Sequence, residues 1–96
     1  MYLKKEELAA EIRHYQQSGR CSERLGGMLL RLAQGVAQRF ARDLEQEDVI
    51  SEGVLNLLVA LPKFQPDRCQ ALTFATSCVI RTIFTLRRKQ RSIQKL

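Results

Sequence analysis

Residues 45–64 read EQEDVISEGVLNLLVALPKF, which is the pattern of a helix that packs one side into a protein core. From Val49 to Leu61, apolar residues recur three and four positions apart, the spacing of a helical stripe. Acidic residues gather between Glu45 and Asp48, where negative charge complements the amide end of a helix. Proline lacks a backbone donor and disfavours helix in the residue before it. The stretch therefore predicts one helix that begins near residues 45–48 and is closed or kinked by Pro62.

The chain on either side of this stretch predicts three further helices. The first covers about residues 3–17, and the second covers about residues 22–43 with Ser22 as its N-cap. Turn residues at Pro66 and Asp67 mark a loop over residues 63–70. A fourth helix is expected to begin near Leu72 or Thr73 and to dissolve into the basic residues that follow. The apolar stripes consist of Leu8, Ile12 and Tyr15 in the first helix, of Leu25, Met28, Leu29, Leu32, Val36 and Phe40 in the second, and of Ala75, Val79, Ile83 and Leu86 in the fourth.

Length and composition bound the fold class. The chain has 96 residues, of which 45% are hydrophobic and 27% are charged, as is usual for one compact soluble domain. No alternation of apolar and polar residues persists long enough to predict a strand. We therefore expect an all-α fold, a compact bundle of about four helices, in a single domain over residues 1–96. Within it, residues 1–20 would form an N-terminal helix, residues 22–91 the core helices and residues 87–96 a basic C-terminal end.

The sequence lacks the motifs of an enzyme, a metal protein or a membrane protein. It has neither a phosphate-binding glycine loop nor a Cys–His pair that would activate a nucleophile. Cys21, Cys69 and Cys78 form no C-x-x-C pair and His14 is the only histidine, so we expect reduced thiols and neither a metal site nor a cofactor. No apolar run is long enough to span a bilayer, and no signal core follows Met1. These features predict a cytoplasmic protein that does not act at a membrane.

The net charge of the chain is concentrated at one end. Ten basic residues balance all ten acids within residues 1–80, so the formal charge of +6 arises entirely from residues 81–96. Such an asymmetry favours a polyanion as the partner of the C-terminal end. A solvated basic tail is the alternative interpretation.

An ordered series of short motifs extends from residue 48 to residue 91. The sequence D-V-I-S-E-G begins at Asp48, K-F-Q-P-D-R begins at Lys63, T-F-A-T begins at Thr73, and a basic helix end follows Arg81. This series resembles region 2 of the bacterial sigma-70 family, and residues 30–40 are similar to the family helix that precedes it. The resemblance covers about residues 28–91. It implies a helical domain that takes part in transcription initiation and is not itself an enzyme.

The resemblance implies that the helix after residue 45 binds bacterial core RNA polymerase. In the family, the matching face docks on the clamp helices of the β′ subunit. An acidic and polar face would pair with arginines there, and leucines would add apolar contact. An ordinary exposed helix face is the alternative interpretation of the same residues. The implied polymerase-binding residues are Leu30, Asp48, Ser51, Glu52 and Leu58.

The resemblance also implies that residues 64–91 recognise and melt a −10-like promoter element, mainly through the non-template strand. Phe64, Arg68 and Phe74 match the family positions that frame a flipped adenine, and core packing is the alternative role of both phenylalanines. Gln65 offers a donor and an acceptor to a base edge. The other implied DNA contacts are Thr73, Thr76 and Ser77 to phosphates or bases, and Arg81, Arg87, Arg88, Lys89 and Arg91 to the backbone.

Two departures from the family pattern bear on the function. Ser77 and Cys78 stand near the place of the family's paired tryptophans, as in several alternative sigma factors. The resemblance covers no helix-turn-helix of the kind that reads a −35 element, so we expect the chain to be similar in scope to phage late sigma factors and to the smaller half of two-subunit sigma factors. We therefore expect a second protein to supply −35 recognition. Two alternatives stay open: a polymerase-binding regulator that competes with host sigma without initiating, and a small DNA-binding protein that contacts no polymerase.

Overall fold

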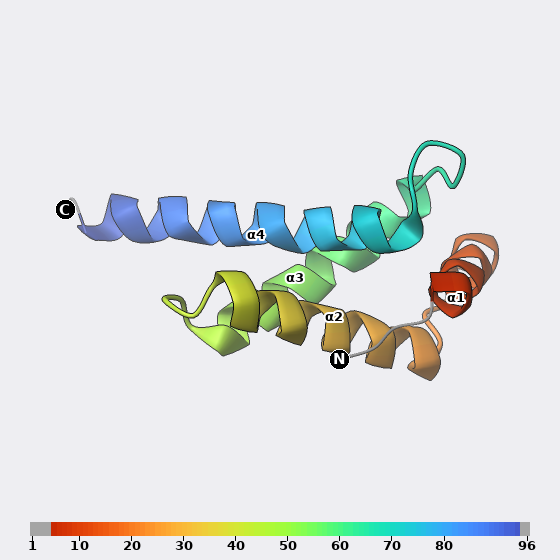
Figure 1. Ribbon diagram of the computed structural model, residues 1–96, viewed down its shortest axis with the longest axis horizontal. Coiled ribbons are helices and arrows are strands. Elements are labelled where there is room, and N and C mark those ends of the chain that lie inside the picture. The colour runs from red at the N-terminus through yellow and green to blue at the C-terminus, as the bar shows by residue number, and fades with distance from the viewer. Residues whose placement is uncertain (1–4, 95–96) are drawn as a thin grey trace.

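A computed structural model describes the backbone of residues 5–94 and the side chains of residues 5–90. Within that range the chain is built from helices and contains no strand, which confirms the predicted all-α bundle. None of the described helices is both long and apolar enough to cross a membrane. In chain order the elements are α1 (Lys5–Ser18), α2 (Glu23–Phe40), α3 (Gln46–Ala60), the 3-10 turn η1 (Leu61–Lys63) and α4 (Ala71–Gln94) (Figure 1).

Three of the helices form the body of the molecule and the fourth closes one end. α2, α3 and α4 each pack against the other two, and α1 packs against α2, α4 and η1. In Figure 1, α4 runs along the top, α2 lies below it, α3 lies behind both, and α1 stands at the right-hand end. The outer face of α3 is therefore turned away from the side that α2 and α4 present together.

The predicted N-cap of α2 is confirmed. The Ser22 hydroxyl accepts a hydrogen bond of 3.1 Å from the Leu25 backbone N–H and donates one of 2.7 Å to Glu11 on α1. The first bond satisfies an amide that the helix itself leaves without an acceptor. The second ties the beginning of α2 to the preceding helix.

α2 ends at Phe40, three residues before the predicted end. The Ala41 N–H bonds to the Ala37 carbonyl at 2.9 Å, but the Ala41 backbone has left the helical region with a φ of −139°. A short turn follows, closed by the Leu44 N–H on the Ala41 carbonyl at 3.1 Å. Phe40, the last residue of α2, does not belong to the buried stripe that the spacing predicted, and its side chain is 52% exposed.

The core lies where α2, α3 and α4 meet. Gly53 of α3 is buried there, and a Cβ at this position would lie 3.5 Å from the Val79 side chain and 3.7 Å from that of Ala33. The Asn56 amide donates a hydrogen bond of 2.8 Å to the buried Thr82 hydroxyl and so adds a polar link between α3 and α4. The largest fully buried side chains are Leu8, Ile12, Leu25, Leu29, Leu57, Leu61, Ile83, Val49 and Val79.

α4 continues through the basic residues to Gln94, whereas the sequence predicted that it would dissolve there. Residues 71–94 contain neither glycine nor proline, and arginine, lysine and glutamine are good helix formers. The helix begins at Ala71, slightly earlier than predicted. Its inward face carries Ala75, Val79 and Ile83 as expected, while Leu86 is half-buried. The basic residues therefore extend a rigid helix rather than a tail.

Candidate functional site

The outward face of α3 carries acids in its first half and apolar side chains in its second half. Asp48, Ser51 and Glu52 are exposed, as the docking hypothesis requires. Leu55 and Val59 follow at the spacing of the same helical face and are 55% and 64% exposed. We call these five residues the α3 surface. Water-exposed apolar side chains beside carboxylates suit a protein partner that offers both cations and apolar contact.

Leu55 and Val59 were missed by the sequence analysis, which placed the apolar contact at Leu30 and Leu58. Leu30 is indeed exposed on α2. Leu58 is half-buried and packs against the core, and its carbonyl accepts the Tyr15 hydroxyl at 2.8 Å. Leu55 and Val59 could have been identified from the sequence, because they follow Asp48 by seven and eleven residues. Residues at these intervals lie on the same side of a helix.

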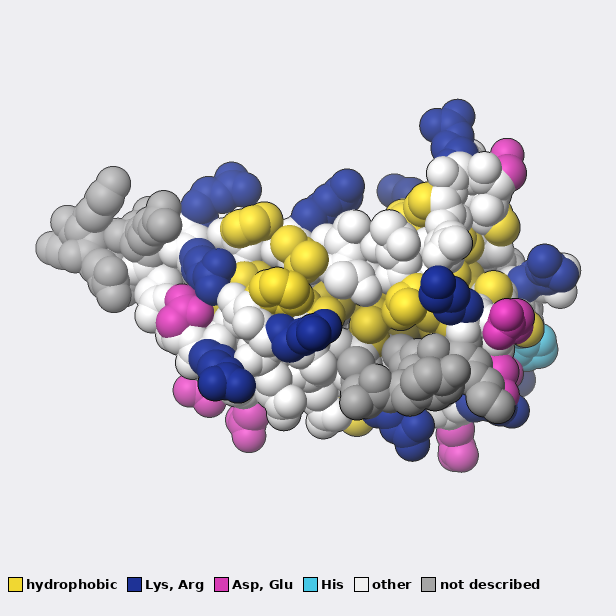
Figure 2. All heavy atoms as spheres, in the orientation of Figure 1, with side chains coloured by type: hydrophobic (Ala, Val, Ile, Leu, Met, Phe, Trp, Pro, Cys, Tyr) yellow, Lys and Arg dark blue, Asp and Glu magenta, His cyan; other side chains and the backbone are white. Residues whose placement is uncertain are grey.

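The face that α2 and α4 present together is basic and apolar. Figure 2 shows apolar side chains gathered over these helices between separate clusters of arginine and lysine. The outward side of α4 carries exposed Thr73, Ser77, Arg81 and Arg88, and residues 71–94 contain no acid. These four sequence-predicted DNA contacts thus share one side of the helix, whereas Phe74 and Thr76 are half-buried.

Phe84 lies in the middle of that outward side and was also missed. Its side chain is 54% exposed. Arg81 precedes it by three residues and Arg88 follows it by four, so both guanidinium groups belong to the same strip of surface. An aromatic ring between two cations is the combination on which a nucleic-acid base stacks while its phosphates are neutralised. The spacing R-x-x-F-x-x-x-R in the sequence could have identified Phe84 as part of this surface.

The two phenylalanines of the predicted base pocket lie against each other. The Phe64 and Phe74 ring centroids are 5.0 Å apart and their planes are inclined at 45°. Phe64 is only 6% exposed, so its ring packs in the core and is not open to a base in this structure, whereas Phe74 is half-buried. Gln65 and Arg68 follow in an exposed loop, where the Arg68 N–H bonds to the Gln65 carbonyl at 3.1 Å.

Arg87 is held by the protein, so its phosphate contact, predicted from the sequence, would compete with bonds inside the molecule. Its guanidinium group makes two hydrogen bonds to the Asp43 carboxylate, at 2.9 and 3.2 Å, and one of 2.6 Å to the Phe40 carbonyl. The hydrogen bond from Arg87 lowers the pKa of the Asp43 carboxyl group from its ordinary value. Arg87 thus fastens α4 to the end of α2. Arg88 and Lys89 are exposed, and the side chain of Arg91 lies outside the described residues.

Neighbouring arginines with different surroundings allow a matched test. Replacing Arg88 by alanine should leave thermal stability unchanged and reduce the salt slope of DNA binding by about one unit, since one phosphate contact is lost. Replacing Arg87 by alanine should lower the melting temperature, because three hydrogen bonds are lost, and leave the slope unchanged. Thermal melting and salt titration of polymerase-dependent DNA binding measure the two effects. The same change of slope in both variants would contradict this division of roles.

The Arg87–Asp43 pair should also give a defined pH dependence. A carboxyl group whose pKa is lowered on folding stabilises the folded state above its unfolded pKa, and this contribution disappears as the pH falls through the folded pKa. The ordinary pKa of Asp43 is 3.8. The melting temperature of the unaltered protein should therefore exceed that of the Arg87→Ala variant most at neutral pH, and the difference should shrink below about pH 4. A difference that grows on acidification would contradict the assignment.

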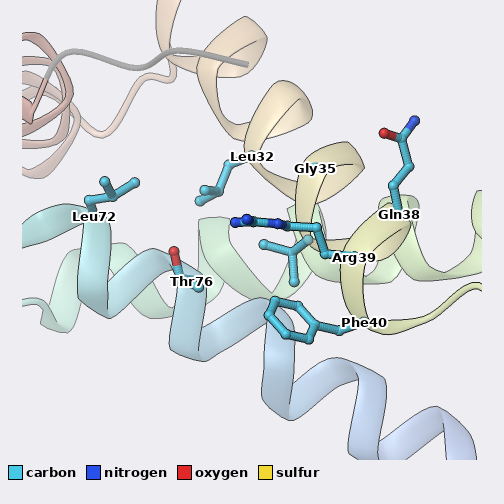
Figure 3. Close-up of a pocket in the computed structure, with 8 residues that line it drawn as sticks. Leu32, Gly35, Gln38, Arg39, Phe40, Leu72 and Thr76 are labelled. Carbon is cyan, nitrogen blue, oxygen red and sulfur yellow. The ribbon is translucent and has the colours of Figure 1, made fainter.

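A hollow of about 540 Å³ lies between α2 and α4 (Figure 3). Leu32, Val36 and the Phe40 ring of α2 give it apolar walls together with Leu72 of α4, and Thr76 of α4 completes the lining. The Arg39 side chain reaches across its mouth. The hollow therefore joins apolar walls to one cationic side chain.

The titratable groups show no arrangement for metal binding within the described part of the chain. No cluster of three or more histidine, cysteine or acidic side chains occurs there. Cys21 and Cys69 are exposed free thiols, while Cys78 is buried, and this burial raises the pKa of its thiol. What the two surfaces offer is therefore binding through charge, aromatic rings and apolar contact.

Comparison with known proteins gives one match. The family model described as sigma-70 region 2 matches residues 25–93, which include α3, η1 and nearly all of α2 and α4. No curated protein and no solved structure matches the chain. α1 lies before the matched segment.

Proposed function

The chain belongs to the sigma-70 region 2 family, and we propose that it initiates transcription by joining bacterial core RNA polymerase to a −10-like promoter element. Domains of this family bind core polymerase and promoter DNA and act in transcription initiation without being enzymes. In this proposal, the α3 surface docks on the clamp helices of the β′ subunit. The side formed by α2 and α4 holds the opened non-template strand.

The observation that carries the proposal is the division of the molecule into two unlike surfaces. The α3 surface presents carboxylates followed by exposed Leu55 and Val59. The outward side of α4 presents exposed arginines around an exposed phenylalanine and no acid. Both surfaces point away from the shared core, because the buried sides of α3 and α4 face each other across it. One protein can therefore contact a polymerase and DNA at the same time.

DNA binding would follow a division of labour along the chain. Phe74, Gln65 and Arg68 contact an unpaired base, and Phe64 supports the Phe74 ring from the core. Thr73, Thr76 and Ser77 bond to the strand, and Phe84 adds a stacking surface worth about 1–3 kcal/mol for each base it holds. Arg81, Arg88, Lys89 and Arg91 neutralise phosphates. A protein with this role works in the bacterial cytoplasm, and contacts to a −35 element come from a separate protein.

Transcription from purified components tests the proposal. Core polymerase is incubated with the protein and a pool of DNA with a randomised upstream segment, and run-off transcripts are selected and sequenced. We expect transcripts that share an upstream element and that require the protein. Inhibition of host sigma without such transcripts would instead support the competing-regulator alternative. Tight binding to duplex DNA together with no binding to core polymerase would support the small DNA-binding protein.

A further inference from the structure

α1 holds the beginning of the DNA-contacting loop through its glutamine side chain. The Gln16 side-chain amide donates two hydrogen bonds of 2.9 Å, one to the Leu61 carbonyl and one to the Phe64 carbonyl. These acceptors lie 45 and 48 residues further along the chain, at the first residue of η1 and at its C-cap. One side-chain amide thus bonds to both ends of η1, the turn that leads into residues 65–70.

The remainder of the loop has few contacts of its own. Residues 65–70 are all exposed, and the Arg68 N–H to Gln65 carbonyl bond forms a turn within the loop. The direction in which Gln65 leaves the core is therefore set at Phe64. The Phe64 ring is fixed against Phe74, and its carbonyl is fixed by Gln16.

α1 is itself firmly placed on the bundle. Leu8 and Ile12 are each 1% exposed, and Tyr15 donates its hydroxyl to the Leu58 carbonyl at 2.8 Å. Gly19, with a φ of +74°, ends the helix directly after these residues, and its N–H bonds to the Tyr15 carbonyl at 2.8 Å. Gln16 therefore acts from a rigid base, although α1 lies outside the segment that the family model matches.

We infer that Gln16 is a positioning residue that sets the geometry of the loop carrying Gln65 and Arg68, and that α1 is thereby part of the promoter-opening apparatus. Gln16 contacts no nucleic acid in this scheme. It acts through the Phe64 carbonyl, whose orientation decides where the next side chain points. The inference rests on the proposed function for its effect on promoter opening, but not for its effect on the loop.

The test compares Gln16→Glu with Gln17→Glu. The first change keeps the size of the side chain and places a carboxylate against two carbonyl oxygens, so both hydrogen bonds are lost. The second makes the same chemical change at an exposed neighbour on α1 and serves as the matched control. Both changes add the same charge at almost the same place.

Loop order is measured first, on the isolated protein, by hydrogen exchange of residues 61–70 and by the rate of tryptic cleavage after Arg68. We expect both rates to rise about tenfold in Gln16→Glu and to stay unchanged in Gln17→Glu. Exchange in α3 and α4 should be the same in all three proteins. Equal loop rates in the two variants would overturn the inference, whatever the protein does with polymerase.

Polymerase affinity and promoter opening are measured second, with core polymerase and a promoter from the selection described above. Gln16→Glu should bind core polymerase as well as the unaltered protein but open the promoter about tenfold less efficiently. A general loss of folding would lower both values together, and that result would overturn a positioning role. If the unaltered protein opens no promoter while the loop rates change as expected, the proposed function fails and the anchoring of the loop stands.

Discussion

Reversing the charge of Asp48 and Glu52 together, by Asp48→Arg and Glu52→Arg, should weaken binding to core RNA polymerase by about 100-fold or more. Both side chains are exposed on the α3 surface. If arginines of the clamp helices face them, each substitution replaces an attraction by a repulsion between like charges, which costs several kcal/mol. Fluorescence anisotropy with labelled protein and core polymerase measures the affinity.

Glu47→Arg is the matched control for this double variant. Glu47 is exposed in the same first turn of α3, so its replacement disturbs the helix end in the same way. Its side chain, however, projects about 100° around the helix from that of Asp48. Binding should fall only slightly in Glu47→Arg. Equal losses in the two proteins would show that general charge, and not the α3 surface, governs the association.

Of the substitutions proposed for this protein, Leu57→Ala should lower the free energy of unfolding the most. Leu57 is fully buried in α3, and truncation of a buried leucine costs about 2–5 kcal/mol, a large part of the roughly 5–15 kcal/mol that stabilises a domain. For a chain of this length each kcal/mol shifts the melting temperature by about 4–8 °C, so we expect a fall of at least about 10 °C. Thermal denaturation followed by circular dichroism measures it.

Leu55→Ala is the control, two residues away on the same helix. Because Leu55 is 55% exposed, its truncation should leave the melting temperature nearly unchanged. It should instead reduce the affinity for core polymerase, since one of the two exposed apolar side chains of the α3 surface is truncated. Leu57→Ala, measured below its melting temperature, should retain that affinity. A stability loss in Leu55→Ala equal to that in Leu57→Ala would show that the outward face of α3 is misassigned.

The sequence was sufficient for the helices because each has local signals. The stripe in α2 and the Ser22 cap depend on residues within a few positions of one another, and both were predicted correctly except for Phe40. α3 shows the limit of such reasoning. Residues 57–61 are all apolar and Leu55 precedes them, so helical spacing alone does not decide which of these side chains face outward. Only packing against α2 and α4 separates buried Leu57 from exposed Leu55.

The role of Arg87 could not be predicted for a different reason. Its partners, Phe40 and Asp43, lie 47 and 44 residues earlier, and no local pattern links such distant positions. In the sequence, Arg87 and Arg88 look alike within one basic run. The hydrogen bonds of Gln16 could not be predicted for the same reason, because Gln16 and its two acceptors become neighbours only after folding. Contacts of this kind position the candidate site, and the fold alone reveals them.

α4 is continuous from Ala71 to Gln94, so it fixes the distances between the residues along it. At 1.5 Å per residue, Ser77 and Arg88 stand about 16 Å apart along its axis. A continuous helix cannot shorten to fit the ligand that it binds. The separation between these two DNA contacts is therefore fixed in advance, and a strand reaches both at once only where its own spacing matches that distance.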